Sequence, residues 1–318
     1  MKKIFAYPIE LQRFSPLANI LTFDRFSTGF NGWMTLMPNF TQPPDFGTRE
    51  TSIDKSQWPP VMLSSATYRY PGTHGAMSGT YSLKLSTRPL ASRYEELPLP
   101  GSMGHAIKRL SFHRPKRGLM QLEAWFAYTV EQDRVAGTGD LAGLSEPSVR
   151  AFGAGFDIQE GEKRYFAGAR YLNSANGELK QRWQVIKATE STDVEWAHGR
   201  EGEWNRWGVD PMWYGRRYPD GCHDGFLDIP GGGQQLCYNE TDCKINWLYF
   251  RLLFDTAKRE YVELQCEDVT FDLRGMAFTL LAPYARIEKL MNPIFWVEND
   301  TNRRVFFYVD SLVISGDS

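Results

Sequence analysis

Short runs of alternating apolar and polar residues, separated by turn residues, limit the fold of this chain more than any other feature. From Tyr81 to Leu85, a tyrosine and two leucines alternate with a serine and a lysine. A two-residue repeat is typical of a β-strand with one buried face. Similar runs occupy residues 122–128, 164–171, 182–186, 247–254, 260–265, 269–273 and 306–314. Helical periodicity is weak between them, so the sequence predicts an all-β sandwich or barrel.

Turn residues divide the chain into an arm, a body and one long excursion. Residues 1–20 contain two prolines and little periodicity, which predicts an N-terminal arm lying over the body. Residues 21–318 are predicted to form a single domain, with a hairpin turn at Asn173–Gly177. Residues 196–243 lack strand alternation and are rich in tryptophan and arginine, so a loop excursion is expected there. Long loops on a rigid scaffold often carry function.

Three segments near the ends of the chain resemble the opening, early and closing strands of jelly-roll carbohydrate-binding modules. They are Phe23-Asp24-Arg25-Phe26, residues 78–85 and residues 307–314. The resemblance implies a two-sheet jelly roll whose first and last strands meet. It also implies a structural calcium between these strands, with Asp24 and Asp310 as ligands, since calcium prefers carboxylate and carbonyl oxygens. The alternative is that Asp310 only caps a strand edge.

The middle of the chain resembles concanavalin A-like lectins and glucanases, through residues 116–126 and 246–264. The Glu-x-Asp-x-x-Glu strand of laminarinase-type glucanases is absent from the sequence. Residues 164–171 are similar to one strand of jelly-roll alginate lyases, but Asp157-Ile158-Gln159 lacks the histidine of their Gln-Ile-His strand. The resemblance therefore implies a fold and a carbohydrate ligand, and it does not transfer lyase activity.

Aromatic residues make up 14% of the chain, and several stand beside arginines. Rings stack on sugar C–H faces, while arginine binds hydroxyl or carboxylate groups. The predicted ligand-binding residues lie on two neighbouring strand-like runs, 164–171 and 182–186, and in the loop excursion 196–243. They are Tyr165, Arg170, Tyr171 and Trp183 on the runs, and Trp204, Arg206, Trp207, Trp213 and Tyr214 in the loop.

Strand alternation limits this candidate site. It places Arg170 with Phe166 on one face and Tyr165 with Tyr171 on the other, so the four strand residues cannot all face one ligand. The alternative interpretation is cross-strand packing of the aromatic rings, with the arginines on the surface.

Several function classes are disfavoured. A formal net charge of −2 gives no electrostatic drive toward nucleic acid, and no apolar stretch is long enough to span a membrane. The basic start is not followed by an apolar core of signal-peptide length. A cytoplasmic protein is therefore expected if the printed start is native. The four cysteines form no C-x-x-C pair, which disfavours zinc.

The sequence predicts noncovalent recognition of a carbohydrate, an oligosaccharide or a glycoside. One alternative is a glycoside hydrolase or polysaccharide lyase, although no acid spacing indicates the two carboxylates that hydrolysis requires. Another is a structural or interaction subunit whose exposed rings meet a partner chain. The particular sugar, the oligomeric state and the presence of a reaction stay open.

Overall fold

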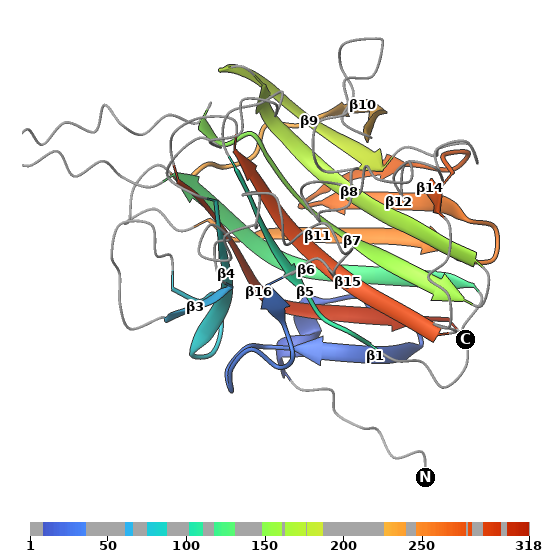
Figure 1. The fold of residues 1–318 in the computed structure, drawn as a ribbon, viewed down its shortest axis with the longest axis horizontal. Coiled ribbons are helices and arrows are strands. Elements are labelled where there is room, and N and C mark those ends of the chain that lie inside the picture. The colour runs from blue at the N-terminus through green and yellow to red at the C-terminus, as the bar shows by residue number, and fades with distance from the viewer. Residues whose placement is uncertain are drawn as a thin grey trace, which may run out of the picture.

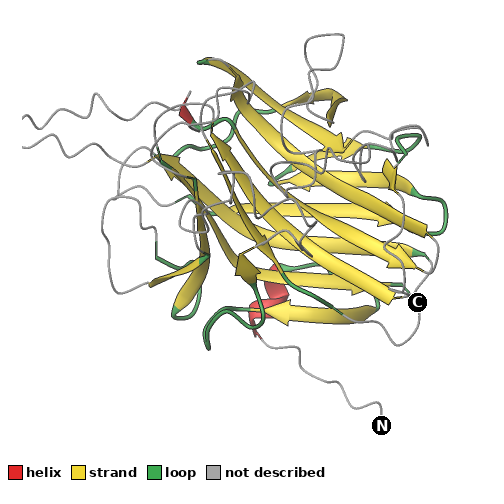
Figure 2. Ribbon diagram, viewed as in Figure 1, coloured by secondary structure: helices red, strands yellow, loops and turns green. Residues whose placement is uncertain are grey.

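The fold consists of two antiparallel β-sheets (Figures 1 and 2). The computed structural model describes residues 9–35, 61–65, 75–87, 102–110, 118–130, 148–160, 163–175, 177–186, 226–239, 246–277, 279–281, 289–299 and 304–317. The prediction of an all-β, two-sheet jelly-roll sandwich is confirmed. Among the described residues, no helix is long and apolar enough to cross a membrane.

Sheet A has the strand order β13-β12-β11-β6-β16-β4-β3, and β1 also pairs with β16. Its strands are β1 (Asn19–Asp24), β3 (Met62–Ser65), β4 (Tyr81–Ser86), β6 (Leu119–Val130), β11 (Leu248–Asp255), β12 (Glu260–Cys266), β13 (Val269–Asp272) and β16 (Val305–Gly316). The first and last strands therefore meet, as predicted: Phe23 pairs with Val313 and Asp24 with Leu312.

Sheet B has the strand order β10-β9-β8-β7-β15-β5-β2, and β14 also pairs with β8. Its strands are β2 (Met34–Thr35), β5 (Ser102–Ile107), β7 (Ala151–Glu160), β8 (Lys163–Ala175), β9 (Glu178–Ile186), β10 (Phe226–Gly233), β14 (Thr279–Leu281) and β15 (Lys289–Asn299). Sheet B lies in front of sheet A in the view of Figure 1.

The inner faces of the two sheets meet in a core rich in aromatic rings. Phe152 of sheet B stacks on Phe307 of sheet A, with ring centroids 5.0 Å apart. Phe156 contacts Phe254 and Trp183 contacts Phe250 across the same space, at 5.2 and 5.5 Å. Such offset and tilted ring pairs add to the stabilisation that area burial gives. Most of the described rings therefore serve the core between the sheets.

The hydroxyl group of Tyr261 forms hydrogen bonds that link the two sheets. It is fully buried on β12, and its hydroxyl accepts from the Gly168 N–H at 2.9 Å. The same hydroxyl donates its proton toward the Gly168 carbonyl at 3.1 Å and the Ile186 carbonyl at 3.2 Å. Burial raises the pKa of Tyr261, so the hydroxyl keeps its proton.

Residues 9–18, the N-terminal segment, lie on the outer face of sheet A. Leu11 and Phe14 pack against Val313 in a small apolar cluster. The Ser15 N–H donates to Glu123 at 2.6 Å, and the Leu17 N–H donates to the Ser315 hydroxyl at 2.9 Å. The division into an arm of residues 1–20 and a single domain of residues 21–318 stays a prediction.

Replacing Tyr261 by phenylalanine tests the link between the sheets. Tyr261→Phe leaves the buried Gly168 N–H without its partner, so the free energy of unfolding should fall by about 1–3 kcal/mol. Tyr81→Phe removes a hydroxyl from a half-buried ring and should change it by less than about 0.5 kcal/mol. Chemical denaturation of both variants measures the difference. Equal losses in the two variants would show that the link contributes nothing specific.

Candidate functional site

The outer face of sheet B carries a row of polar and aromatic residues that crosses the strands. Strand register places one residue of each strand side by side, from β10 to β5. The members of this polar row are Asp228, Gln184, Arg170, Gly153, Trp296 and His105. Since Ala169 and Tyr171 belong to the core, alternation turns Arg170 to this outer face.

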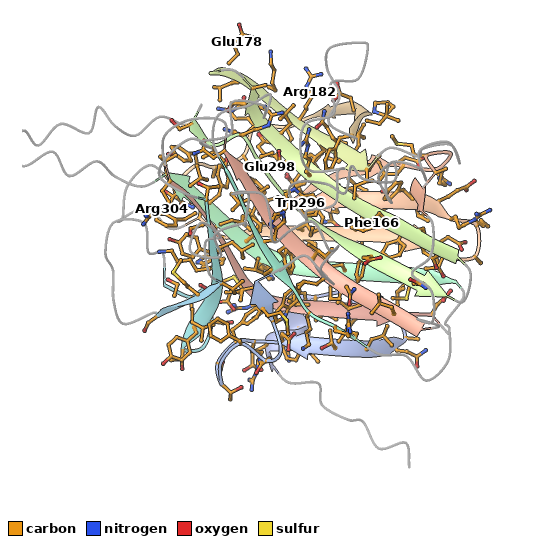
Figure 3. All side chains as sticks on the ribbon, viewed as in Figure 1. Phe166, Glu178, Arg182, Trp296, Glu298 and Arg304 are labelled. Atoms are coloured by element: carbon orange, nitrogen blue, oxygen red, sulfur yellow. The ribbon has the colours of Figure 1, made fainter. Side chains whose placement is uncertain are left out.

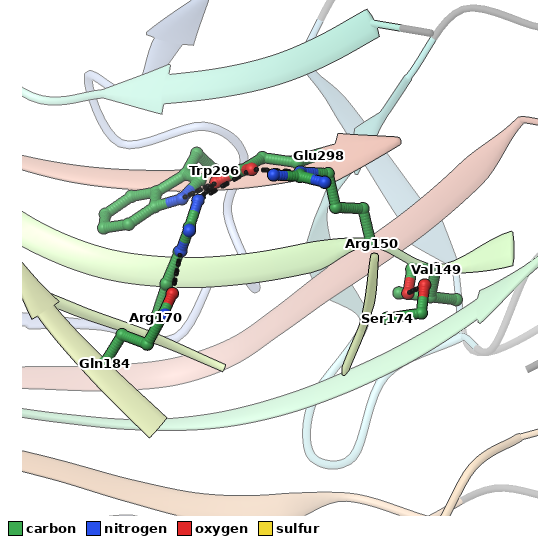
Figure 4. A network of polar contacts seen from close by, with 7 residues as sticks. All are labelled: Val149, Arg150, Arg170, Ser174, Gln184, Trp296 and Glu298. Carbon is green, nitrogen blue, oxygen red and sulfur yellow. Dashed lines mark hydrogen bonds and ion pairs between the residues drawn. The ribbon is translucent and has the colours of Figure 1, made fainter. Parts of the chain in front are cut away.

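A buried ion pair between Arg170 and Glu298 is the centre of this face (Figure 4). One guanidinium nitrogen of Arg170 donates to both Glu298 oxygens at 3.0 Å, and its Nε donates to Gln184 at 2.8 Å. Trp296 Nε1 also donates to Glu298 at 3.1 Å, and Arg150 Nε lies 3.4 Å from the same carboxylate. Charge-assisted bonds of this kind fix both partners in one geometry.

Aromatic rings border the ion pair. The Arg170 guanidinium carbon lies 3.8 Å from the centroid of the Phe226 ring, a cation–π contact. The rings of Phe226 and Trp296 are 6.2 Å apart. Trp296 lies close to the sheet because Gly153 opposite it has no side chain: a Cβ there would lie 2.4 Å from the indole. A glycine inside a strand often marks such a close approach.

The polar row is accessible at its β9–β10 end. Asp228 accepts from Gln184 Nε2 at 2.6 Å and from Arg182 at 2.7 Å. The side chains of Arg182 and Asp228 are 45% and 49% exposed, whereas Arg170 is 2% exposed. Hydrogen bonds therefore connect a solvent-exposed ion pair to the buried one through a single glutamine.

The outer face also holds a second polar pair, Asp157 and Asn292. Asn292 Nδ2 lies 3.5 Å from the Asp157 carboxylate, and both residues are buried. Asn292 and Glu298 are six residues apart on β15, which corresponds to about 20 Å. Glycosidase carboxylates lie about 5 to 9.5 Å apart, so Asp157 and Glu298 are not placed as a catalytic pair. Figure 3 shows Trp296 and Glu298 on β15, with Phe166 on β8.

The structure corrects the prediction for Tyr165, Tyr171 and Trp183. All three belong to the core between the sheets and are at most 3% exposed. The Tyr171 hydroxyl donates to the Gln234 carbonyl at 2.7 Å, and Trp183 Nε1 donates to the Gln234 side chain at 2.8 Å. Because all three rings pack in the core, and the polar atoms of Tyr171 and Trp183 bond to Gln234, these residues are no longer proposed as ligand contacts. Arg170 lies on the other face, as alternation predicted.

The five predicted loop residues lie outside the described part of the chain. Trp204, Arg206, Trp207, Trp213 and Tyr214 therefore stay predictions.

The contribution of β15 to this face was not predicted from the sequence. Residues 292–298 read Asn-Pro-Ile-Phe-Trp-Val-Glu, in which Asn292, Ile294, Trp296 and Glu298 share one face. This alternation was a usable signal, although Pro293 interrupts the pattern expected for a strand in the interior of a sheet.

Calcium binding at Asp24 and Asp310 stays a prediction. Asp24 accepts from Lys108 at 2.7 Å and from Trp33 at 2.9 Å, while Asp310 accepts from the backbone N–H groups of Met77 and Ser78 at 2.5 and 2.7 Å. The described residues contain no group of three or more histidine, cysteine, aspartate or glutamate side chains that could hold a metal. Burial raises the pKa of Asp310, and the bonds from Ser78, Ser311 and Met77 oppose that rise.

The family model described as "Domain of unknown function (DUF6772)" matches residues 1–318, so the chain belongs to that family. No curated protein matches the chain.

Solved structures resemble the chain in fold only. A mutant of alginate lyase Aly36B in complex with alginate trisaccharide is 8% identical, covering 91% of this chain and 99% of that chain, with a TM-score of 0.37. Alginate lyase vAL-1 from Chlorella virus is 9% identical, with coverages of 80% and 89% and a TM-score of 0.39. The potassium-bound Emp46p carbohydrate recognition domain is 10% identical, with coverages of 89% and 96% and a TM-score of 0.37.

Buried His105 predicts a loss of stability in acid. Burial lowers its pKa from 6.5 to about 3, so the folded protein keeps the imidazole neutral while the unfolded chain takes up a proton below pH 6.5. The stability that a neutral His105 contributes is thus complete above about pH 6.5. It should fall by about 1.4 kcal/mol per pH unit as the pH drops toward 3.

Urea denaturation of the wild type and of His105→Gln between pH 7 and pH 4.5 measures this effect. The variant should lose less stability over this range. Equal slopes would show that His105 does not titrate in this way.

Chelation tests the calcium prediction. If calcium joins the terminal strands, it co-purifies with the protein and its removal lowers the melting temperature. Asp310→Asn should then abolish the effect of the chelator. A protein that is free of metal and melts at the same temperature with and without chelator would refute the prediction.

Proposed function

We propose that the protein binds an oligosaccharide noncovalently on the outer face of sheet B. The observation that carries the proposal is the hydrogen-bonded path from the exposed Arg182–Asp228 pair through Gln184 to Arg170 and Glu298. A polyhydroxylated ligand needs donors and acceptors in fixed positions, and this path supplies both.

Two buried aromatic rings hold these polar groups in place: Phe226 is 2% exposed and Trp296 is 0% exposed. Phe226 contacts Arg170, and Trp296 is held by its bond to Glu298. Arginine and carboxylate groups bind sugar hydroxyls, and the two rings fix the positions of Arg170 and Glu298 without facing the ligand themselves. The ligand is expected to enter at Arg182 and Asp228, because these are the exposed members of the path.

Binding is favoured over hydrolysis by the arrangement of the acids. Both oxygens of Glu298 accept from Arg170, so the ion pair already occupies this carboxylate. Asp157 lies too far along the sheet to complete a catalytic pair with Glu298.

Calorimetric titration with neutral and uronate-containing trisaccharides tests the proposal. Arg182→Ala should weaken the binding of a recognised saccharide about tenfold or more, because it removes a charged hydrogen-bond donor. Arg25→Ala is the matched control: Arg25 is also 45% exposed and forms an ion pair with Glu10 at 2.7 Å, but it lies next to β1 of sheet A. The control should bind like the wild type, and both variants should melt close to it.

Two outcomes would contradict the proposal. One is equal affinity of the wild type and Arg182→Ala for every saccharide that binds. The other is conversion of a saccharide to new products during incubation, which would favour the hydrolase or lyase alternative.

A further inference from the structure

The outer face of sheet A carries a second cluster of polar and aromatic residues, on β6 and β11. Strand register places Trp125 opposite Tyr249 and Glu123 opposite Arg251. The rings of Trp125 and Tyr249 are 5.5 Å apart, and the Tyr249 hydroxyl donates to Glu123 Oε1 at 2.6 Å. We name these four residues the β6–β11 patch. It lies on the sheet opposite to the polar row and shares no residue with it.

Three buried polar atoms of the β6–β11 patch have no hydrogen-bond partner in the described structure: Glu123 Oε2, Arg251 Nε and Trp125 Nε1. Glu123 as a whole is 0% exposed. An unpaired buried polar atom costs about 1–3 kcal/mol, and more when the group is charged. One acceptor and two donors thus lie on neighbouring positions, and none of the three bonds to another residue that the structure describes.

The patch is covered on one side and accessible on another. The Ser15 N–H of the N-terminal segment donates to Glu123 Oε1, and Phe14 belongs to the same apolar cluster as the two rings. Toward β12, the side chains of Arg251 and its ion-pair partner Glu263 are 21% and 31% exposed. Trp125 and Tyr249 are half-buried. A ligand can therefore approach along Arg251.

We propose that the β6–β11 patch is a second binding site, for a neutral saccharide. A sugar hydroxyl both donates and accepts, so it can donate to Glu123 Oε2 while it accepts from Arg251 Nε or Trp125 Nε1. The two rings offer an apolar surface for the C–H face of the sugar. The patch itself holds one carboxylate and one guanidinium, and Glu263 on its accessible side adds a second carboxylate, which disfavours an acidic ligand and suits a neutral one. The proposal does not rest on binding at sheet B.

Nuclear magnetic resonance of the indole N–H groups tests the site, with cellotriose, maltotriose and mannotriose as probes. Trp125→Phe identifies the Trp125 signal. At least one probe should shift that signal in the wild type. Arg251→Gln should weaken the response about tenfold or more. Arg274→Gln, the matched control, removes an exposed arginine that pairs with Asp272 at 2.6 Å, and it should respond like the wild type.

A second variant keeps the test decisive if Arg251→Gln folds poorly. Tyr249→Phe retains the ring and removes the hydroxyl that holds Glu123 in place, so it should also weaken the response. Absence of a Trp125 shift with all three probes overturns the proposal, and so does an unchanged response in a folded Arg251→Gln protein. Loss of the Trp125 response in Arg182→Ala also overturns it, because the saccharide would then bind at sheet B.

Discussion

Strand β16 pairs with β6 from Val305 to Gly316 and uses its other edge for two partners, first β4 and then β1. The change of partner coincides with a bulge at Asp310 and Ser311, where Ser311 has a φ of 45°. Asp310 accepts the backbone N–H groups of Met77 and Ser78 beside this bulge. Because β16 brings β1 into sheet A, it also determines where the N-terminal segment lies, and Ser315 and Val313 contact that segment directly.

Strand alternation in the sequence was sufficient to predict the sandwich and the opposite orientations of Arg170 and Tyr171. It could not show which of the two faces is the core, and so Tyr165, Tyr171 and Trp183 were assigned to a ligand. It also could not pair Arg170 with Glu298, because these residues are 128 positions apart and their contact depends on the register of three strands. Periodicity gives the face of a residue, whereas its partners come from long-range register.

Both outer faces bury charged groups, among them Arg170, Glu298 and Glu123. Burying an ion pair such as Arg170–Glu298 costs desolvation that roughly cancels its attraction, so apolar residues of similar volume would stabilise the sheet equally well or better. Glu123 is buried, and one of its oxygens has no hydrogen-bond partner among the described residues, which is unfavourable for folding alone. The ligands proposed for the two faces would each give these polar groups a role that folding does not.

The charges of the two faces differ, which bears on what each could bind. Around the polar row, Arg150, Arg170 and Arg182 accompany Glu298 and Asp228, so the described cations outnumber the anions that they contact. The β6–β11 patch has one residue of each sign, and Glu263, which pairs with Arg251, adds a further anion beside it. If both faces bind sugar, they lie on opposite sides of the sandwich, so a short oligosaccharide occupies only one of them. A long or branched polysaccharide that reached both would bind more tightly than either site alone, because the second contact becomes intramolecular.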